Sequence, residues 1–96
     1  MKRTVSPQAT EIQRRFFQAL DYAIESKLIL GLRGWCIDHN LNRVKYANIR
    51  SEMNKPIEER KETNYKTIDL DALAYVCTDF GVSSDWLLHG KGKMLK

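Results

Sequence analysis

The chain has 96 residues, of which 43% are hydrophobic and 29% charged, and this length suits one small domain with a single core. It opens with basic and then polar residues, without the apolar stretch of a signal peptide, and no later apolar run is long enough to span a bilayer. We therefore expect a soluble, cytoplasmic protein with no membrane partner. The net charge is +4, and residues 1–66 hold 13 Lys and Arg against 8 Asp and Glu, whereas residues 67–96 hold 3 against 4. This asymmetry favours a polyanionic partner, although a solvated basic face would give the same counts.

The first predicted helix follows a short N-terminal arm. Residues 1–9 contain few large apolar groups and are expected to form a flexible arm, so we place the folded domain at residues 10–90. Ser6-Pro7 is a pair that favours the start of a helix. Apolar residues then recur at helical spacing, namely Ile12, Phe16, Leu20, Ala23, Ile24 and Leu28. Residues 27–32 should connect this helix to the next.

Two short helices with a tight turn between them are predicted next. The second helix should cover residues 33–39, and the third should cover residues 43–53. Asn40 tolerates left-handed backbone, and Asn42 is a good N-cap. Residues 40–42 are therefore predicted to form the turn.

The rest of the chain is predicted to be a charged loop followed by two more helices. Residues 54–66 are polar and contain one proline, which fits an exposed loop. A fourth helix should begin near Asp69. Its broad apolar face comprises Leu70, Leu73, Ala74, Val76, Cys77 and Phe80. Gly81 should end it, Ser83 should cap a short fifth helix, and residues 91–96 should form a basic tail. Since no strand pattern occurs, we predict a compact all-α domain.

The residue pattern does not indicate a catalytic or metal-binding site. Cys36 and Cys77 have no second thiol or histidine at zinc-ligand spacing, and we interpret both as buried apolar residues rather than as a disulfide. His39 and His89 stand without a carboxylate or cysteine cluster, and no nucleophile is identified on which a general base could act. We therefore predict no enzymatic activity, no metal, no cofactor and no small-molecule ligand.

The two central helices have the chemistry of an element that recognises DNA. A helix, a short turn and a second helix at roughly a right angle present the second helix as a ridge that fits the major groove. Residues 43–50 carry three positive charges and no negative one. Arg43, Lys45 and Arg50 have the charge to neutralise phosphates or pair with guanine, and the amide of Asn48 suits adenine. A solvated amphipathic helix in a bundle is the alternative that periodicity leaves open.

The segment LRGWCIDHNLNRVKYANIR resembles the helix-turn-helix of lambda-repressor-like (Xre-type) regulators. Cys36 takes the place of a small residue in the first motif helix, Asn40 that of the turn glycine, and Asn42 the capping position. The apolar turn position and the two inward positions of the recognition helix are taken by Leu41, Tyr46 and Ile49. Leu32 stands where the family commonly has a glutamine that holds a phosphate, so Arg33 is the candidate for that contact.

A second segment, LDALAYVCTDFGVSSDWLLHGKGKM, is similar to the closing helices of phage-type repressors, a leucine-rich helix followed by the pattern GVS.DWLL.G.G. Together the two segments cover roughly half of the chain, and their order and separation match that family. The resemblance implies a five-helix lambda-repressor-like fold. It also implies sequence-specific binding of double-stranded DNA and regulation of transcription, often of mobile-element genes.

We therefore predict that the third helix enters the major groove. The residues expected nearest to base edges are Asn42, Arg43, Val44, Ala47 and Asn48. The residues expected nearest to phosphates are Arg33, Lys45, Arg50 and Lys55. A homodimer that binds paired half-sites is a secondary expectation. The alternative function is a protein-interaction adaptor, such as an antitoxin-like or phage accessory module, that keeps the fold without reading DNA.

Overall fold

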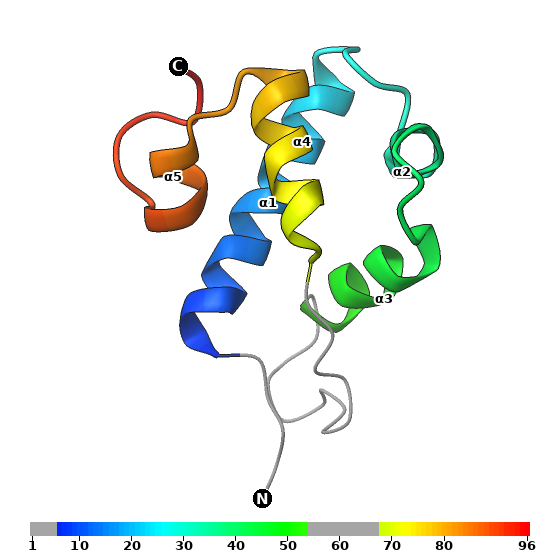
Figure 1. Cartoon of the computed structure of the whole chain (residues 1–96), viewed down its shortest axis with the longest axis horizontal. Helices are drawn as coiled ribbons and strands as arrows, with labels where there is room; N and C mark the ends of the chain where they lie inside the picture. The colour runs from blue at the N-terminus through cyan, green and yellow to red at the C-terminus, as the bar shows by residue number, and fades with distance from the viewer. Residues whose placement is uncertain (1–5, 54–67) are drawn as a thin grey trace, which may run out of the picture.

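The computed structural model describes residues 6–53 and 68–96 of the chain (Figure 1). These residues form five helices and no strand, apart from one isolated antiparallel pairing of Val82 with Leu95, which confirms the all-α prediction for them. The helices are α1 (Pro7–Glu25), α2 (Leu32–Asp38), α3 (Arg43–Met53), α4 (Leu70–Phe80) and α5 (Ser84–His89). Among the described helices, none combines the length and the apolar character that crossing a membrane requires.

Helices α1 and α4 form the centre of the molecule. They run side by side, with α5 packed on α1 at one edge and the α2–α3 pair at the other (Figure 1). In that view α2 is seen end-on while α3 runs across the picture, so their axes cross steeply. The buried apolar side chains come from all five helices and from residues next to α4, and comprise Phe16, Phe17, Ala19, Leu20, Ala23, Trp35, Cys36, Tyr46, Ile49, Ile68, Ala72, Val76, Phe80, Val82 and Leu87. Helix α3 thus lies at the edge of the molecule and is attached to it by the side chains on its buried side.

Helix α1 begins earlier than the sequence pattern placed the domain. Ser6 is its N-cap, and the hydroxyl oxygen of Ser6 accepts a hydrogen bond from the backbone N–H of Ala9 at 3.1 Å. Pro7, which has no N–H to leave unpaired, is the first helical residue. The predicted boundary between residues 9 and 10 therefore falls inside a helix.

The end of α1 and the chain that follows it differ from the periodic pattern. The helix ends at Glu25, and Lys27 then turns the backbone with a φ of 63°. Leu28, which continued the helical spacing in the sequence, is therefore 53% exposed. Phe17 and Gln13 are buried instead, because the face that meets α4 and α5 is wider than the predicted stripe.

The turn between α2 and α3 has the predicted form. Asn40 has a φ of 57°, in the left-handed region that asparagine tolerates. The backbone N–H of Leu41 donates to the carbonyl of Cys36 at 2.7 Å, which closes the end of α2. The side-chain oxygen of Asn42 accepts from the backbone N–H of Lys45 at 3.0 Å and caps α3. Helix α3 has the predicted bounds, whereas α2 both begins and ends one residue earlier than predicted.

Helix α4 presents a different face to the core from the one predicted. Its fully inward positions are Ala72, Val76 and Phe80, which recur every four residues, while Leu73 and Cys77 pack at the margin. Leu70 is 82% exposed and Ala74 is also exposed, because they lie on the far side of that stripe. Periodicity alone did not separate these two adjacent faces.

The ends of α4 and α5 follow the predicted glycine and serine signals. Gly81 and Gly90 terminate the two helices in left-handed conformations, with φ values of 68° and 70°. The hydroxyl of Ser83 accepts from the backbone N–H of Trp86 at 3.4 Å.

The last residues return to the fold. The N–H of Ser83 donates to the carbonyl of Met94 at 2.7 Å, and the N–H of Lys96 donates to the carbonyl of Gly81 at 3.1 Å. Met94 packs against the core, so the segment 91–96 that we expected as a basic tail ends in ordered contacts.

Candidate nucleic-acid interface

Helix α3 has one buried side and one exposed side. Tyr46 and Ile49 are buried, as predicted, and the ring of Tyr46 makes an edge contact with Phe16 at 5.9 Å between centroids. On the opposite side lie four of the five predicted base-contacting residues, all exposed, namely Arg43, Val44, Ala47 and Asn48. Because they are spaced at i, i+1, i+4 and i+5, they share one face of the helix.

Asn42, the fifth predicted base-contacting residue, is exposed but also has a structural role. Its side-chain oxygen is engaged by the backbone N–H of Lys45 at the start of α3. The side-chain NH₂ group is the part that could donate to a base acceptor. The structure therefore places Asn42 at the start of the exposed face of α3, with its side-chain oxygen already accepting one hydrogen bond.

Lys45, predicted to contact phosphate, is paired with a carboxylate. Its Nζ atom lies 2.9 Å from Oδ1 of Asp69, the N-cap residue of α4, and its side chain is 23% exposed. The hydroxyl of Tyr46 donates to the other oxygen of Asp69 at 2.6 Å. These two hydrogen bonds, from Tyr46 first and Lys45 second, lower the pKa of Asp69. Burial, followed by the hydrogen bond to Asp69, raises the pKa of Tyr46.

Arg50, also predicted to contact phosphate, is held by α1. Its Nη2 atom donates to Oδ1 of Asp21 at 2.6 Å, and its guanidinium carbon lies 5.7 Å from the centre of the Phe17 ring. The side chain of Arg50 is 37% exposed. Ion pairing and a cation–π contact thus fix this arginine against the first helix.

Of the two other predicted phosphate contacts, Arg33 is exposed near the start of α2 and makes no ion pair with any residue that the structure describes. Lys55 lies outside the described residues, as does the predicted loop 54–66. Within the described part of the motif, Arg33 and Arg43 are thus cations without an ion pair, whereas Lys45 and Arg50 lie against acidic groups.

Sequence reasoning did not find Asp21 and Asp69 as components of this surface. They are 29 and 24 residues away from their partners, and neither spacing has a periodic signature. The fourth helix was predicted to begin near Asp69, and Asp69 does occupy its N-cap position. Its side chain, however, makes no cap hydrogen bond and is directed to α3 instead.

Helix α2 is anchored to α4 by a polar and aromatic cluster. Oδ2 of Asp79 accepts from Nε1 of Trp35 at 3.1 Å and lies 2.6 Å from Nε2 of His39, within hydrogen-bond distance. The His39 ring stacks on Tyr75 with 4.0 Å between centroids and meets Trp35 edge-on. Because His39 directly precedes the turn, this cluster fixes the position from which α3 begins.

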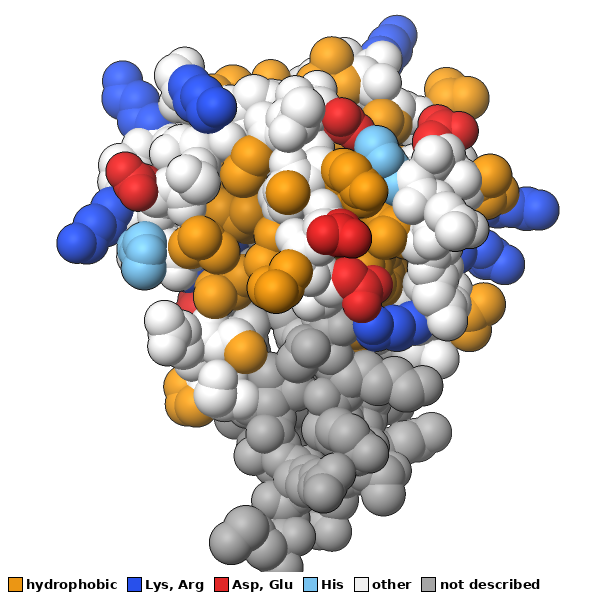
Figure 2. Space-filling model, in the orientation of Figure 1, with side chains coloured by type: hydrophobic (Ala, Val, Ile, Leu, Met, Phe, Trp, Pro, Cys, Tyr) orange, Lys and Arg blue, Asp and Glu red, His pale blue; other side chains and the backbone are white. Residues whose placement is uncertain are grey.

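The charge distribution over the molecule is uneven. In Figure 2, apolar side chains gather over the front face, where α4 and α5 lie in Figure 1, and Lys and Arg side chains lie mainly around its rim. Acidic side chains also lie on that front face, which is therefore a poor match for a polyanion (Figure 2).

Cys36 and Cys77 are free thiols in this structure. Cys36 is fully buried as predicted, whereas Cys77 is only partly buried at the margin of the core. Burial raises the pKa of both. Among the described residues, no three His, Cys, Asp or Glu side chains gather in a way that could hold a metal ion.

Comparison of the chain with models of protein families, with curated proteins and with solved structures finds no match. The functional interpretation therefore depends on the residues of α2 and α3 and on their surroundings.

Proposed function

We propose that this protein binds double-stranded DNA sequence-specifically by inserting α3 into the major groove, and that it acts in the cytoplasm as a repressor-like regulator of transcription. The observation that carries the proposal is the exposed face of α3. A guanidinium on Arg43, an amide on Asn48 and small apolar groups on Val44 and Ala47 project from one side of a helix that is buried on the other. These are the groups that pair with guanine, with adenine and with the thymine methyl group.

The arrangement around α3 supports the proposal. Helix α2, the turn at residues 40–42 and α3 follow one another with steeply crossed axes, as in helix-turn-helix proteins (Figure 1). The resemblance of two segments to lambda-repressor-like and phage-type repressors agrees with this order of elements. We accordingly assign the five helices to a lambda-repressor-like domain as part of the proposal.

A selection of bound sequences from a random duplex pool tests the function most directly. It should return a defined motif, and binding to that motif should fall steeply as salt is added. Asn48→Ala and Arg43→Ala should each weaken binding to the selected site by about 1–3 kcal/mol and relax the preference at one base pair. Binding to random duplex should change much less for Asn48→Ala.

Matched controls are available on α1. Gln18 is an exposed amide outside the motif, and Arg14 is an exposed arginine that pairs only with Glu11 among the described residues. Gln18→Ala and Arg14→Ala should leave the sequence preference unchanged. An enriched pool with no common motif, or equal losses for Arg43→Ala on selected and random duplex, would contradict the proposal.

Arg33 is the expected phosphate contact from α2. Arg33→Ala should weaken binding to all sequences by a similar factor, and it should reduce the slope of log K against log salt by about one. A loss confined to one base pair would instead assign Arg33 to base recognition.

Dimerisation on DNA is part of the proposal, because the surface of one such helix is small and two half-sites are usually about 34 Å apart. Analytical ultracentrifugation of the protein with the selected duplex should give two copies per site. A monomer both free and on DNA would exclude this part.

A second candidate function is a protein-interaction module that keeps the fold without sequence-specific recognition. The pairing of Lys45 with Asp69 and of Arg50 with Asp21 favours it, since these carboxylates cancel two of the positive charges on α3. The selection experiment separates the candidates, because a module of this kind would be indifferent to duplex DNA even at low salt.

A further inference from the structure

Two cations of α3 are held by carboxylates that come from other parts of the fold. Nζ of Lys45 lies 2.9 Å from Asp69 at the start of α4, and Nη2 of Arg50 lies 2.6 Å from Asp21 on α1. Both cations stand at positions that the sequence pattern assigns to phosphate contacts. Each ion pair therefore links α3 to the central helices and at the same time neutralises a charge that DNA would use.

One partner of each ion pair is also held by a second contact. Asp69 also accepts from the hydroxyl of the buried Tyr46 at 2.6 Å, so its carboxylate has a fixed position. Arg50 is held by the Phe17 ring as well as by Asp21. Because Asp69 and Arg50 are each held by a second contact, less side-chain entropy is lost when each ion pair forms, and this loss is one reason that surface pairs are usually weak.

The pairs nevertheless remain open to solvent. The side chains of Asp69 and Asp21 are 46% and 47% exposed, and that of Arg50 is 37% exposed. The Lys45 ammonium carries three donors and the Arg50 guanidinium five, of which the carboxylates take only part. A phosphate group could therefore reach either cation, but it would have to compete with a carboxylate already in place.

We propose that Asp69 and Asp21 are internal competitors of phosphate that weaken binding of this protein to polyanions in general and leave discrimination to the exposed face of α3. Where DNA is concerned, the inference rests on the proposed function. Its consequence is that removal of either carboxylate charge strengthens binding to random duplex more than binding to the selected site. The ratio between the two affinities, which is the specificity, then falls.

The test for Asp69 uses Asp69→Asn, which keeps an oxygen for the Tyr46 hydroxyl but removes the charge. Asp71→Asn is the matched control, because Asp71 is exposed two residues further along and makes no ion pair with any described residue. Each variant is made with Lys45 intact and with Lys45→Gln. Affinity for a random duplex and the salt concentration of elution from heparin are measured for all of them.

We expect Asp69→Asn to bind random duplex on the order of five- to tenfold more tightly at about 0.1 M salt, because one more phosphate contact adds about 0.9 to the salt slope. It should also elute from heparin at higher salt than Asp71→Asn. Lys45→Gln should reduce this gain to the small gain expected for Asp71→Asn, which should itself stay unchanged. In the wild-type background, Lys45→Gln should weaken binding by less than it does in the Asp69→Asn background.

The test for Asp21 has the same design. Asp21→Asn should strengthen binding in a manner that depends on Arg50, which is tested with Arg50→Gln. Glu25→Gln is its control, because Glu25 is an exposed acid on the same helix that makes no ion pair with any described residue. Circular dichroism of each variant verifies that the helices are retained. If Lys45→Gln or Arg50→Gln does not fold, the comparison of Asp69→Asn and Asp21→Asn with their controls decides the test.

Equal gains for Asp69→Asn and Asp71→Asn, or a gain for Asp69→Asn that is undiminished in the Lys45→Gln background, would overturn the role of Asp69. The corresponding results with Glu25→Gln and Arg50→Gln would overturn that of Asp21. If wild type and variants all ignore duplex DNA while heparin elution still shows the cation-dependent gains, the proposed DNA function fails and the competition by the carboxylates stands. If wild type binds a specific duplex and the variants show no such gains, the DNA function stands and the competition fails.

Discussion

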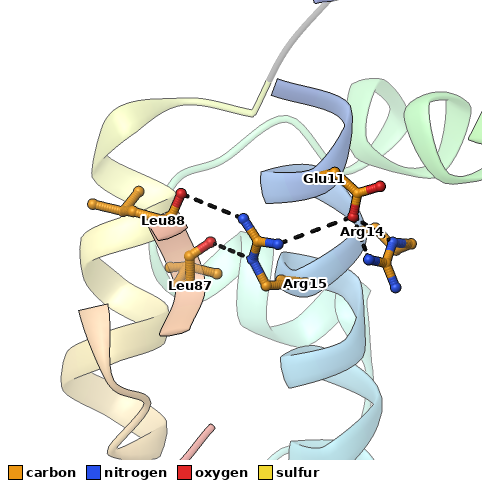
Figure 3. Close-up of polar contacts among 5 residues, drawn as sticks. All are labelled: Glu11, Arg14, Arg15, Leu87 and Leu88. Carbon is orange, nitrogen blue, oxygen red and sulfur yellow. Dashed lines mark hydrogen bonds and ion pairs between the residues drawn. The ribbon is translucent and has the colours of Figure 1, made fainter. Parts of the chain in front are cut away.

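The guanidinium of Arg15 on α1 lies at the C-terminal end of α5, where its Nε atom donates to the carbonyl oxygen of Leu87 at 2.8 Å. Its Nη2 atom donates to the carbonyl oxygen of Leu88 at 3.3 Å, as Figure 3 shows. The last carbonyls of a helix have no partner within the helix, and they carry the negative end of its dipole. Arg15 therefore provides hydrogen-bond donors for carbonyl groups at the end of α5. It also joins α5 to α1, although Arg15 and Leu87 are 72 residues apart in the sequence.

Replacement of Arg15 by alanine should destabilise the protein by about 1–3 kcal/mol, the usual range for the loss of charged hydrogen bonds with a partner left unpaired. For a domain of this size the melting temperature should fall by several degrees, about 4–8 °C per kcal/mol. Urea unfolding followed by tryptophan fluorescence measures the change, since Trp86 lies on α5.

Arg14→Ala is the control for this prediction. Arg14 is the neighbouring residue, and it is exposed and paired only with Glu11 among the described residues (Figure 3). Its loss should change stability by less than about 1 kcal/mol. Equal effects of the two substitutions would show that the contacts of Arg15 with α5 do not stabilise the fold.

The local parts of this fold were predictable because they depend on residues close in sequence. Helix α3, the left-handed turn at Asn40, the cap at Asn42 and the stop at Gly81 each follow from the hydrogen bonds or backbone angles of a few consecutive residues. The inward positions Tyr46 and Ile49 of the candidate site follow from the same short-range pattern and the family resemblance.

The parts that were not predictable depend on which helices meet. No local pattern indicates that Arg15 would reach α5, or that Asp69 would be directed to Lys45 rather than to its own helix. Leu70 and Phe17 are both large apolar residues. Leu70 is exposed, whereas Phe17 is buried because it faces a neighbouring helix. The ion pairs of the candidate interface could therefore be identified only from the tertiary structure.

The bonds from Tyr46 and Lys45 to Asp69 predict a dependence of stability on acid pH. Because these bonds lower the pKa of Asp69 in the folded protein, its carboxylate contributes stability above the unfolded pKa of about 3.9. That contribution is lost as the pH falls below this value and through the lower folded pKa. Asp69→Asn should thus be less stable than wild type at neutral pH, and the difference should shrink in acid.

Urea unfolding at a series of pH values from neutral to strongly acid measures this difference. Asp71→Asn, which removes a carboxylate without an ion pair to any described residue, should give a difference from wild type that changes much less over the same range. A constant gap between wild type and Asp69→Asn at every pH would exclude the assigned linkage.

Asp79 should be required for the position of α2. Its carboxylate accepts from the indole N–H of Trp35, which is buried, and contacts His39. Asp79→Ala would leave that indole donor without a partner, and the expected cost is about 1–3 kcal/mol. The near-ultraviolet circular dichroism of the tryptophans should change as well. The control is Asp38→Ala, which removes an exposed acid from the end of α2 and should change neither the stability nor the circular dichroism appreciably. If Asp79→Ala also changes neither quantity, the cluster does not stabilise the fold.

Asn40 offers a test of the turn that places α3. At a φ of 57° a side chain with a Cβ atom is strained, and asparagine tolerates this conformation better than alanine does. Asn40→Ala should therefore destabilise the protein by about 1 kcal/mol, whereas Asn40→Gly should stay within about 0.5 kcal/mol of wild type because glycine adopts positive φ freely. Asn48→Ala, the same substitution on the exposed face of α3, should leave stability unchanged or raise it slightly, since alanine favours helix. Chemical denaturation measures the stability of the three variants. If Asn40→Gly is less stable than Asn40→Ala, asparagine does not act at this turn by relieving backbone strain.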